Sequence, residues 1–499
     1  MNIIGYDLPH INHASFLETK EFPVSETHTL TTYDAILDAI TTNSDSDGTA
    51  EIHNPATGEV VGSYQIQDEN DLNEAVALAR QAQPDWEAHG DHARCQLLNK
   101  FADAIEAAAE PLARLLSQEQ GKPLNGPNAR FEVGACAAWL RATASFESPD
   151  YTAVDDDITA TVHYRPLGVV GAIGPWNWPM MITIWQIAPA LRMGNTVVVK
   201  PSGYTPLSVS ALVAIANTVL PKDVLHIVTG DGGVGAALTT HPGIDKIMFT
   251  GSTETGKKII EASAGNITRL TLELGGNDAA VVLDDVDPQA IAEDLFWGAF
   301  INTGQTCAAA KRIYVPDAIY DELAQALVAV AKKMPMGQGL DENNVLGPLQ
   351  NKAQFDIVDG LVKAAKDGGG RVLVGGDPDY DAPGFFYPVT IVADIDPDNP
   401  LVVEEQFGPA VPLIRYSELD QAIAWANSLD VGLGASVWSA DAQKAREVAG
   451  RLQAGTVWIN KHGAVDPRVP FGGIKSSGYG VEFGTEGLKG LAYPQAINT

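Results

Sequence analysis

The sequence predicts an α/β protein built around two parallel sheets of the Rossmann type. From residue 168 onward, short β-branched runs alternate with stretches of helical spacing, which is typical of strands and helices that build a parallel sheet. The alternation occurs in two series, the first to about residue 274 and the second from there to about residue 460. The chain has 499 residues and 45% hydrophobic content, more than one core usually holds. We therefore expect two lobes, each the size of a nucleotide-binding fold.

The segments before the first sheet differ in character. Residues 1 to about 50 are polar and weakly patterned, so we expect an extension ahead of the compact body. Residues 71–118 are rich in alanine with helical spacing and predict at least two amphipathic helices. The stretch from Pro166 to Leu191 has no charged residue and is long enough to span a membrane, but three prolines interrupt it. We expect it to form buried core beside an active site.

The strands and helices of the two lobes can be placed in order. Strands are expected at GVVGAI, NTVVVK, VLHIVT, KIMFT and LTLEL in the first lobe, with a helix opening at Thr205 and Pro206. The second lobe is expected to begin with the strand AAVVL, a helix near 288–302, the strand RIYV and a helix near 318–333.

Charge and cysteine content exclude several classes of protein. The 63 acidic and 32 basic residues give a formal net charge of −31, which repels nucleic acids and anionic membranes, so neither is an expected partner. The N-terminus lacks a basic segment followed by an apolar one, so no secretory signal is expected. The cysteines Cys95, Cys136 and Cys307 are odd in number and widely spaced, which argues against disulfides and predicts a reducing, cytoplasmic compartment.

Two glycine-rich turns are candidates for binding phosphate groups. GDGGVG at 230–235 follows a predicted strand and matches a dinucleotide-binding turn, although tight packing explains it equally well and Asp231 would lie close to an anion. GSTETGKK at 251–258 nearly matches a nucleoside-triphosphate loop, but Lys258 stands where Ser or Thr must ligate magnesium. Without the magnesium ligand, the motif indicates only the start of a helix at Ser252. This helix start could bind a pyrophosphate, or Ser252 could simply cap the helix.

Three side chains are candidates for catalysis. Cys307 lies in NTGQTCAAA among small residues that leave room for a substrate, although a lone cysteine is usually a small buried side chain. Glu273 ends a predicted buried strand, where a carboxylate must serve chemistry or an ion pair. Asn177 lies among tryptophans and prolines, where its amide could donate to an oxyanion or cap a loop.

Seven motifs stand in order along the chain: GPWNWP (174–179), VVKPS (198–202), FTGSTETG (249–256), LELGG (272–276), GQTCA (304–308), EEQFGP (404–409) and PFGGIKSSG (470–478). In this order and spacing they resemble the aldehyde dehydrogenase superfamily. The resemblance runs from about Asn54 to the C-terminus, so it covers nearly all of the chain except the extension.

The resemblance implies a covalent mechanism without a metal. Cys307 would be the nucleophile, Glu273 the base that activates water, and Asn177 with the Cys307 backbone N–H the oxyanion hole. An aldehyde would then be oxidised to its carboxylic acid through a thiohemiacetal and a thioester. The alternatives are an enzyme that transfers the acyl group to coenzyme A, against which Glu273 argues, and a non-catalytic binding protein on the same scaffold.

The resemblance also implies the cofactor NAD, with NADP as a second candidate. Trp176 and Ser252 would contact the pyrophosphate, Lys200 the adenosine ribose, and Glu405 with Phe407 the nicotinamide riboside. The other expected cofactor-binding residues are Gly174, Pro175, Ser202, Gly203, Gly232, Gly235, Phe249, Gly251, Leu274 and Gly275. The aldehyde tunnel would be lined by Trp178, Trp185 and Phe471. Glu482 would assist Glu273 in relaying protons.

The sequence departs from the family pattern at two positions. Gly203 replaces the usual glutamate of the KPxE motif, so we expect weak discrimination between NAD and NADP, and Asn277 replaces the usual lysine after ELGG. Separately, Lys461, His462 and Arg468 lie near Phe471 in sequence. They predict either recognition of a distal carboxylate on the substrate or a solvated loop.

The family fold implies a division of the chain into parts. After an extension over 1–50, a cofactor-binding domain would take 51–145 and 165–275, and a catalytic domain 276–485. A small oligomerisation sheet would take 146–164 and 486–499, which implies a homodimer or homotetramer.

Overall fold

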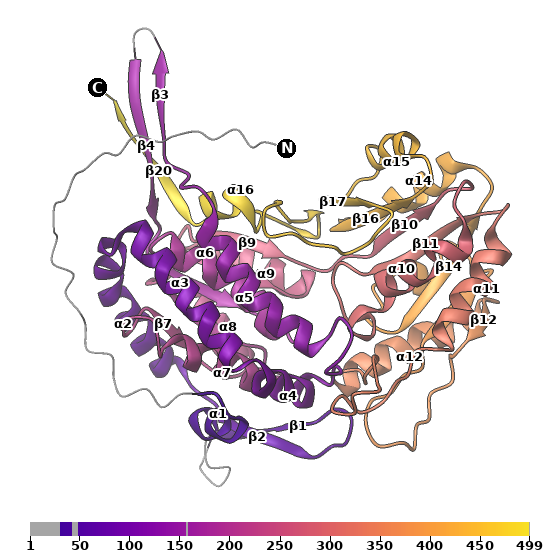
Figure 1. The fold of residues 1–499 in the computed structure, drawn as a ribbon, viewed down its shortest axis with the longest axis horizontal. Coiled ribbons are helices and arrows are strands. Elements are labelled where there is room, and N and C mark those ends of the chain that lie inside the picture. Colours follow the sequence, from indigo (N-terminus) through magenta and orange to yellow (C-terminus); the bar gives the residue numbers. More distant parts are fainter. Residues whose placement is uncertain (1–29, 42–47, 156–157, 499) are drawn as a thin grey trace, which may run out of the picture.

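The computed structural model describes residues 30–41, 48–155 and 158–498 (Figure 1). The extension expected over residues 1–50 therefore lies largely outside the described residues. Within it, helix α1 (Tyr33–Ile40) is not a free tail, because the Ile36 side chain is buried in the core of the first lobe. The strand β1 (Thr49–His53) then pairs with β2 (Val60–Gln65).

The first lobe is built on a sheet in the order β19-β9-β8-β5-β6-β7. Its strands β5 to β9 pair in parallel, as predicted, and the short β19 runs antiparallel to β9. The bounds are β5 (Val169–Ile173), β6 (Thr196–Lys200), β7 (Leu225–Ile227), β8 (Lys246–Thr250), β9 (Arg269–Glu273) and β19 (Gly478–Tyr479).

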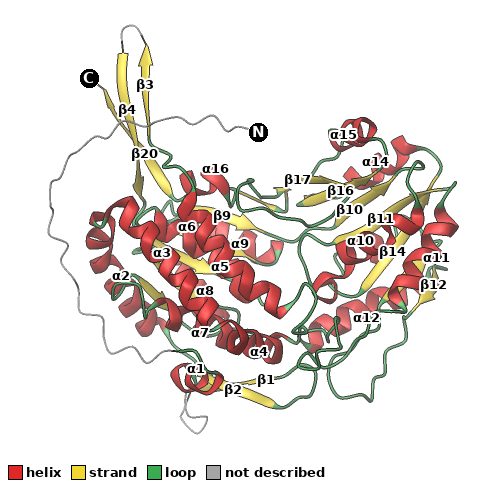
Figure 2. Cartoon of the chain, in the orientation of Figure 1, coloured by secondary structure: helices red, strands yellow, loops and turns green. Residues whose placement is uncertain are grey.

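Helices pack around this sheet (Figure 2). They are α2 (Glu69–Ala88), α3 (Gly90–Ala107), α4 (Ala109–Gln120), α5 (Ala129–Ser145), α6 (Pro179–Arg192), α7 (Pro206–Ala216), α8 (Gly232–Thr240) and α9 (Thr253–Ser263). Every residue of α6 is buried, which confirms that the uncharged stretch forms core. No helix among the described residues is long and apolar enough to cross a membrane.

The second lobe contains a sheet in the order β12-β13-β14-β11-β10-β16-β17, in which only β12 pairs antiparallel to its neighbour. The strands are β10 (Asp278–Val282), β11 (Ala310–Pro316), β12 (Arg371–Val374), β13 (Thr390–Ala393), β14 (Ala410–Tyr416), β16 (Gly434–Trp438) and β17 (Thr456–Ile459). The helices are α10 (Pro288–Phe300), the 3-10 helix η1 (Ile301–Gly304), α11 (Tyr320–Ala331), α12 (Lys352–Asp367), α13 (Pro400–Val403), α14 (Leu419–Asn427) and α15 (Ala442–Ala449).

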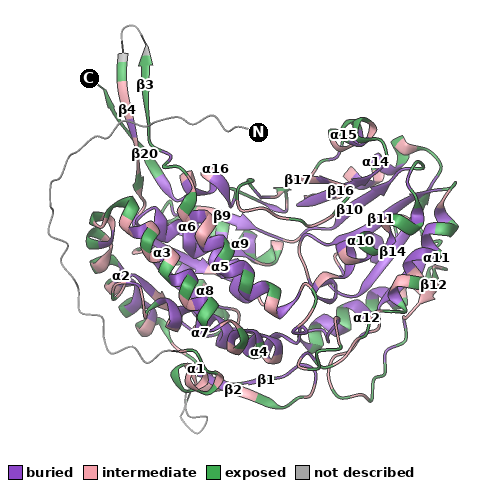
Figure 3. Ribbon diagram, viewed as in Figure 1, coloured by how far each residue is buried: buried purple, intermediate pink, exposed green. Residues whose placement is uncertain are grey.

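A third sheet projects from the body of the first lobe (Figures 1 and 3). It has the order β20-β4-β3, with strands β3 (Tyr151–Asp155), β4 (Ile158–Pro166) and β20 (Ala492–Asn498). Smaller elements complete the chain, namely β15 (Val431–Gly432) paired with β18 (Ile474–Lys475), and α16 (Gly484–Lys489). The third sheet thus joins a segment near residue 160 to the C-terminal strand.

The two large sheets are linked by a short connection. Strand β9 ends at Glu273 and strand β10 begins at Asp278, so the chain passes from the first sheet to the second through residues 274–277. The carboxyl end of β9 therefore lies beside the start of β10. In parallel α/β sheets, ligands bind outside the carboxyl ends of the strands.

Candidate active site

Glu273 is a buried carboxylate at the end of β9. Its residue is 5% exposed, and neither carboxylate oxygen has a hydrogen-bond partner among the residues that the structure describes. Burial, and then the charge of Glu482, raises the pKa of Glu273 well above its ordinary range. A carboxylate whose pKa is raised binds a proton more tightly, which suits a general base.

A left-handed turn presents Cys307. After α10 the backbone of Asn302 and Thr303 has φ values of 50° and 57°, and Gly304 follows with φ 76°. A Cβ at Gly304 would lie 2.2 Å from the carbonyl oxygen of Gly408, so only glycine fits. This turn directs the chain to Cys307.

The surroundings of the Cys307 thiol favour its protonated form. The residue retains partial solvent exposure, yet burial raises the pKa of its thiol to about 12. The positive charge of Lys311 lowers this pKa. The negative charges of three carboxylates raise it further, namely those of Asp278, Glu405 and Glu273. A base must therefore remove the proton before the sulfur can attack a substrate.

Asn177 is tied to the loop that carries the cysteine. Its Nδ2 donates a hydrogen bond to the carbonyl oxygen of Gln305, two residues before Cys307, at 2.9 Å. Its own carbonyl oxygen accepts hydrogen bonds from Nζ of Lys122 at 2.7 Å and from Nδ2 of Asn302 at 2.9 Å. One N–H of the Asn177 amide is thus used to hold the loop, and an amide has a second N–H to offer.

The groups that hold Asn177, Lys122 and its partner Glu132, were not predicted from the sequence. Lys122 forms a fully buried ion pair with Glu132, whose other carboxylate oxygen accepts from the backbone N–H groups of Met180 and Met181 at the start of α6. The ammonium also lies 3.6 Å from the ring centroid of Trp178. Lys122 and Glu132 carry no local motif, and their pairing is visible only in three dimensions.

Aromatic side chains gather near Glu273. Trp185 lies 4.8 Å from Phe483 between ring centroids and 5.6 Å from Trp139, and Phe471 stacks on Phe483 at 5.9 Å. A Cβ at Gly472, next to Phe471, would lie 3.2 Å from a Glu273 carboxylate oxygen. We call these four rings, of Trp139, Trp185, Phe471 and Phe483, the aromatic cluster; Trp139 and Phe483 were not expected.

Trp178 makes different contacts from the other two expected lining residues. Its Nε1 donates to the Thr306 hydroxyl at 2.9 Å, and its ring packs edge-on against Phe131. It therefore lies against the loop that carries Cys307.

The residues expected to bind the cofactor meet at one edge of the first sheet. They follow the carboxyl ends of the five adjacent strands β9, β8, β5, β6 and β7. After β8, Ser252 caps α9 by accepting from the Thr255 N–H, and a Cβ at Gly251 would lie 2.5 Å from the Phe249 ring. After β7, the Asp231 carboxylate caps α8 by accepting from the Gly233 N–H at 2.7 Å. Lys200, at the end of β6, is buried and donates to the carbonyl oxygen of Pro201.

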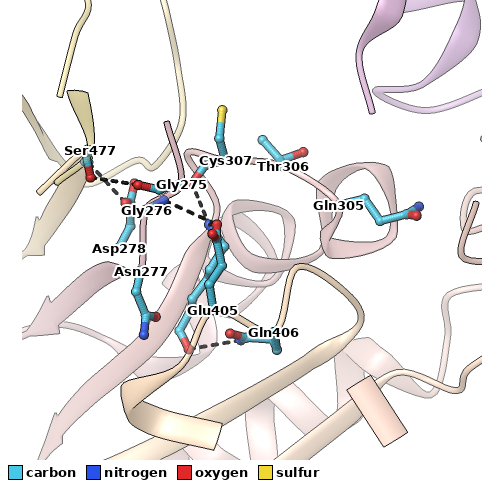
Figure 4. Close-up of polar contacts among 12 residues, drawn as sticks. Gly275, Gly276, Asn277, Asp278, Gln305, Thr306, Cys307, Glu405, Gln406 and Ser477 are labelled. Atoms are coloured by element: carbon cyan, nitrogen blue, oxygen red, sulfur yellow. Dashed lines mark hydrogen bonds and ion pairs between the residues drawn. The ribbon is translucent and has the colours of Figure 1, made fainter. Parts of the chain in front are cut away.

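The second lobe contributes Glu405 and Phe407 at the same place. The Glu405 carboxylate accepts from the Gly276 N–H at 3.3 Å and lies against Gly275, close to the Cys307 loop (Figure 4). The Phe407 ring meets Trp176 edge-on with 5.4 Å between centroids. Residues from both lobes thus come together at the end of β9.

The two positions that break the family pattern differ in their surroundings. Gly203 has open space, because a Cβ there would find its nearest neighbour in the Tyr64 hydroxyl at 3.6 Å. Asn277 is buried and donates from Nδ2 to the carbonyl oxygen of Val402 at 3.0 Å, so it links the two segments of the second lobe.

The three basic residues near Phe471 do not form a carboxylate site. The His462 side chain is fully buried, 2.9 Å from the Ser436 hydroxyl and 3.5 Å from the Asp278 carboxylate. Arg468 is exposed and forms an ion pair with Asp466 at 2.6 Å. Lys461 is exposed. The geometry favours the solvated-loop interpretation.

Comparison with known proteins agrees with this geometry. A sequence profile described as the aldehyde dehydrogenase family matches residues 41–497. The geranial dehydrogenase of Castellaniella defragrans is 39% identical over 88% of this chain and 93% of its own length, and the phenylacetaldehyde dehydrogenase of Pseudomonas fluorescens is 38% identical over 90% and 92%. The crystal structure of an NAD-dependent aldehyde dehydrogenase from Sinorhizobium meliloti is 34% identical, covers 93% of each chain, and superposes with a TM-score of 0.88.

Proposed function

This chain belongs to the aldehyde dehydrogenase family, and from that premise we propose that it oxidises an apolar aldehyde to the carboxylic acid with NAD. The observation that carries the proposal is the state of Glu273. Its carboxylate is buried without a hydrogen-bond partner among the described residues, and its charge acts on the Cys307 thiol. Burying a carboxylate without a partner costs free energy. A role as the base in two proton transfers explains why this carboxylate is buried.

The first step is the attack of sulfur on the aldehyde. Glu273 accepts the thiol proton, the Cys307 sulfur forms a bond to the carbonyl carbon, and the carbonyl oxygen becomes an oxyanion. The second N–H of the Asn177 amide donates to this oxyanion, with the Cys307 backbone N–H beside it. Loss of one such donor typically lowers the rate by about 10²–10³. The product of this step is a thiohemiacetal on Cys307.

The residues at the carboxyl ends of the first sheet fit NAD. The N-terminus of α9 offers free backbone N–H groups to a pyrophosphate, Lys200 lies at the end of β6 for the adenosine ribose, and Glu405 can accept from ribose hydroxyls near Cys307. NAD bound here would supply the acceptor for the hydride of the thiohemiacetal, which would leave a thioester on Cys307. Residues 51–145 and 165–275 would then be the cofactor-binding domain and 276–485 the catalytic domain.

Hydrolysis of the thioester is the second task of Glu273. Glu273 first releases the thiol proton to solvent, so that its carboxylate can take a proton from water. The water oxygen then attacks the thioester carbon, and the Cys307 sulfur leaves with the return of this proton from Glu273. Transfer of the acyl group to coenzyme A needs no such base. The position of Glu273 beside Cys307 therefore favours release of the acid by water.

The substrate is proposed to be apolar. The aromatic cluster includes Phe471, whose neighbour Gly472 packs against Glu273, and the exposed Arg468 is paired with Asp466. The two relatives above are named for geranial and phenylacetaldehyde, both of which are apolar aldehydes. Aromatic side chains bind such groups by burying apolar surface.

The third sheet is proposed to form a contact between subunits, and the free cysteines are used to propose a compartment. Tyr151, Val154, Tyr493 and Ile497 are exposed on this sheet, and residues 146–164 and 486–499 are proposed to pair with a second copy in a homodimer or homotetramer. Cys95, Cys136 and Cys307 are all free thiols, which supports a reducing, cytoplasmic location.

The direct test is oxidation of phenylacetaldehyde in ¹⁸O-labelled water without coenzyme A. Formation of NADH together with one ¹⁸O in the released acid, beyond what exchange of the aldehyde explains, would support hydrolysis. Turnover that requires coenzyme A would contradict it.

A further inference from the structure

The Lys311 ammonium is buried between the Cys307 loop and Glu405. Its side chain is 2% exposed, and its Nζ lies 3.0 Å from a Glu405 carboxylate oxygen. The same Nζ donates a hydrogen bond to the backbone carbonyl oxygen of Cys307 at 2.5 Å. Lys311 thus contacts the backbone of the nucleophile and a side chain from another part of the second lobe at once.

Both ends of this contact are held firmly. Lys311 is the second residue of β11, which pairs with β10 on one side and β14 on the other. The Glu405 oxygen that Lys311 contacts also accepts from the Gly276 N–H, and a Cβ at Gly275 would lie 2.5 Å from the other carboxylate oxygen. Figure 4 shows Glu405, Gly275 and Gly276 gathered at the Cys307 loop. The positions of the ammonium and the carboxylate are therefore set by the backbone around them.

Lys311 is also the positive member of the charges that act on the thiol. Asp278 on β10, Glu273 at the end of β9, and Glu405 are the negative ones. The Asp278 carboxylate also lies 3.5 Å from Nε2 of His462, and both side chains are buried. A neutral side chain at position 311 would leave the charges of these three carboxyl groups acting on the thiol without a compensating positive charge, which disfavours the thiolate.

We propose that Lys311 is a positioning residue that holds the Cys307 loop and Glu405 together and supplies the positive charge that favours the Cys307 thiolate. This inference rests on the proposed function for the role of Cys307 as nucleophile and of Glu405 at the nicotinamide riboside. It predicts opposite effects from the loss of the two charges. Without Lys311 the thiol should react more slowly, and without Glu405 it should react faster.

The test is the rate at which iodoacetamide alkylates Cys307, in which the thiolate displaces iodide. The rate is followed by peptide mass spectrometry between about pH 7 and about pH 9.5, where the thiolate fraction sets it. Lys311→Gln keeps a hydrogen-bond donor but loses the charge, and should react about tenfold more slowly at each pH. Glu405→Gln should react several-fold faster, and the double variant should return toward the wild-type rate.

Matched controls use the same substitutions at exposed positions. Lys363→Gln on α12 and Glu404→Gln, next to Glu405, remove surface charges and should leave the rate unchanged. A Lys311→Gln rate equal to or above that of the wild type would overturn the proposal. If Lys311→Gln does not fold, Glu405→Gln decides alone, because a faster rate supports the proposal and an equal or slower rate overturns it.

The assay needs neither aldehyde nor NAD. If the wild-type enzyme failed to oxidise aldehydes while the opposite rate changes persisted, the proposed function would fail and the electrostatic role of Lys311 would stand. A purely structural role for Lys311 would lower the melting temperature of Lys311→Gln without a rate change of opposite sign in Glu405→Gln.

Discussion

Nζ of Lys122 lies 2.5 Å from a carboxylate oxygen of Glu132, and neither side chain is exposed to solvent. Removal of one partner of a buried ion pair leaves an uncompensated charge and typically costs about 3–5 kcal/mol. Lys122 also holds the Asn177 carbonyl. Lys122→Met should therefore lower the free energy of unfolding by about that amount and lower kcat by up to about 100-fold, because a misplaced catalytic group reacts slowly.

Urea unfolding and steady-state kinetics measure the two effects of Lys122→Met. Lys100→Met, an exposed lysine on α3, is the control and should change neither quantity. Because Lys122→Met/Glu132→Gln removes both charges and keeps an acceptor for the Met180 and Met181 N–H groups, it should recover stability relative to the single variant. A single variant as stable and as active as the wild type would show that the ion pair does not hold the site.

Cys307→Ala should abolish aldehyde oxidation and leave NAD binding intact, because the sulfur supplies the bond to the substrate and no part of the adenosine or pyrophosphate site. NADH formation and the dissociation constant of NAD are the measurements. Cys95→Ala, a free cysteine on α3, is the control and should retain full activity. Substantial turnover by Cys307→Ala would exclude the covalent mechanism.

Gly203→Glu should raise the ratio of kcat/KM for NAD over NADP. A carboxylate there would accept from the ribose hydroxyls and repel a 2′-phosphate, and hydrogen bonds to a charged group contribute about 1.5–3 kcal/mol. The open space at Gly203 accommodates the side chain. An increase of about tenfold or more is expected.

The control for this change is Gly203→Ala, which fills the same space without a charge and should leave the ratio near that of the wild type. We expect the wild-type enzyme to accept NADP, since no carboxylate stands at position 203. Complete rejection of NADP by the wild type would point to another group, and the Asp231 carboxylate, which acts on Lys200, would be the first to test.

The stability of the protein should decrease as the pH rises from about 4.5 to about 7, in part because of Glu119. Burial raises the pKa of this carboxyl group to about 7, although the N–H groups of Leu207 and Ser208 donate to it. The folded protein therefore holds this proton more tightly than the unfolded chain. The resulting stability is present below about pH 4.5 and is lost as the pH rises through about 7.

Glu119→Gln cannot titrate, so its free energy of unfolding should vary less over this interval, by on the order of 1–3 kcal/mol. Chemical unfolding at a series of pH values measures the difference. Glu322→Gln, an exposed residue on α11, should keep the wild-type dependence. An identical pH dependence in Glu119→Gln and wild type would show that this group is not the cause.

The alternation of strands and helices was sufficient to predict both sheets. Runs such as KIMFT and LTLEL are buried on both faces and bounded by turns, so β8 and β9 lie where expected. The motifs also drew attention to Cys307, Glu273 and Asn177, whose roles stay predictions; Glu273 ends β9, and the other two lie in the loops before β11 and α6. The helix expected near 288–302 ends earlier, at Phe300, because left-handed residues follow in η1.

Other parts of the site depend on long-range packing that local sequence does not encode. In the sequence nothing distinguishes Lys122, Glu132 and Lys311 from other charged residues. The fold buries Lys122 against Asn177, Glu132 against Met180, and Lys311 against Cys307. Trp139 and Phe483 join the aromatic cluster from α5 and from the segment before α16. His462 illustrates the reverse, since a residue expected near the entrance is fully buried against Ser436.

Release of the acid from Cys307 requires a base that activates water, and this is the role proposed for Glu273. The most direct measurement is the intact mass of Glu273→Gln after mixing with NAD and phenylacetaldehyde. An amide cannot activate water as a carboxylate does, so this variant should accumulate the acyl adduct, located on Cys307 by peptide mapping, after a burst of no more than about one NADH per subunit. Steady hydrolysis at the wild-type rate with no adduct would contradict the role of Glu273.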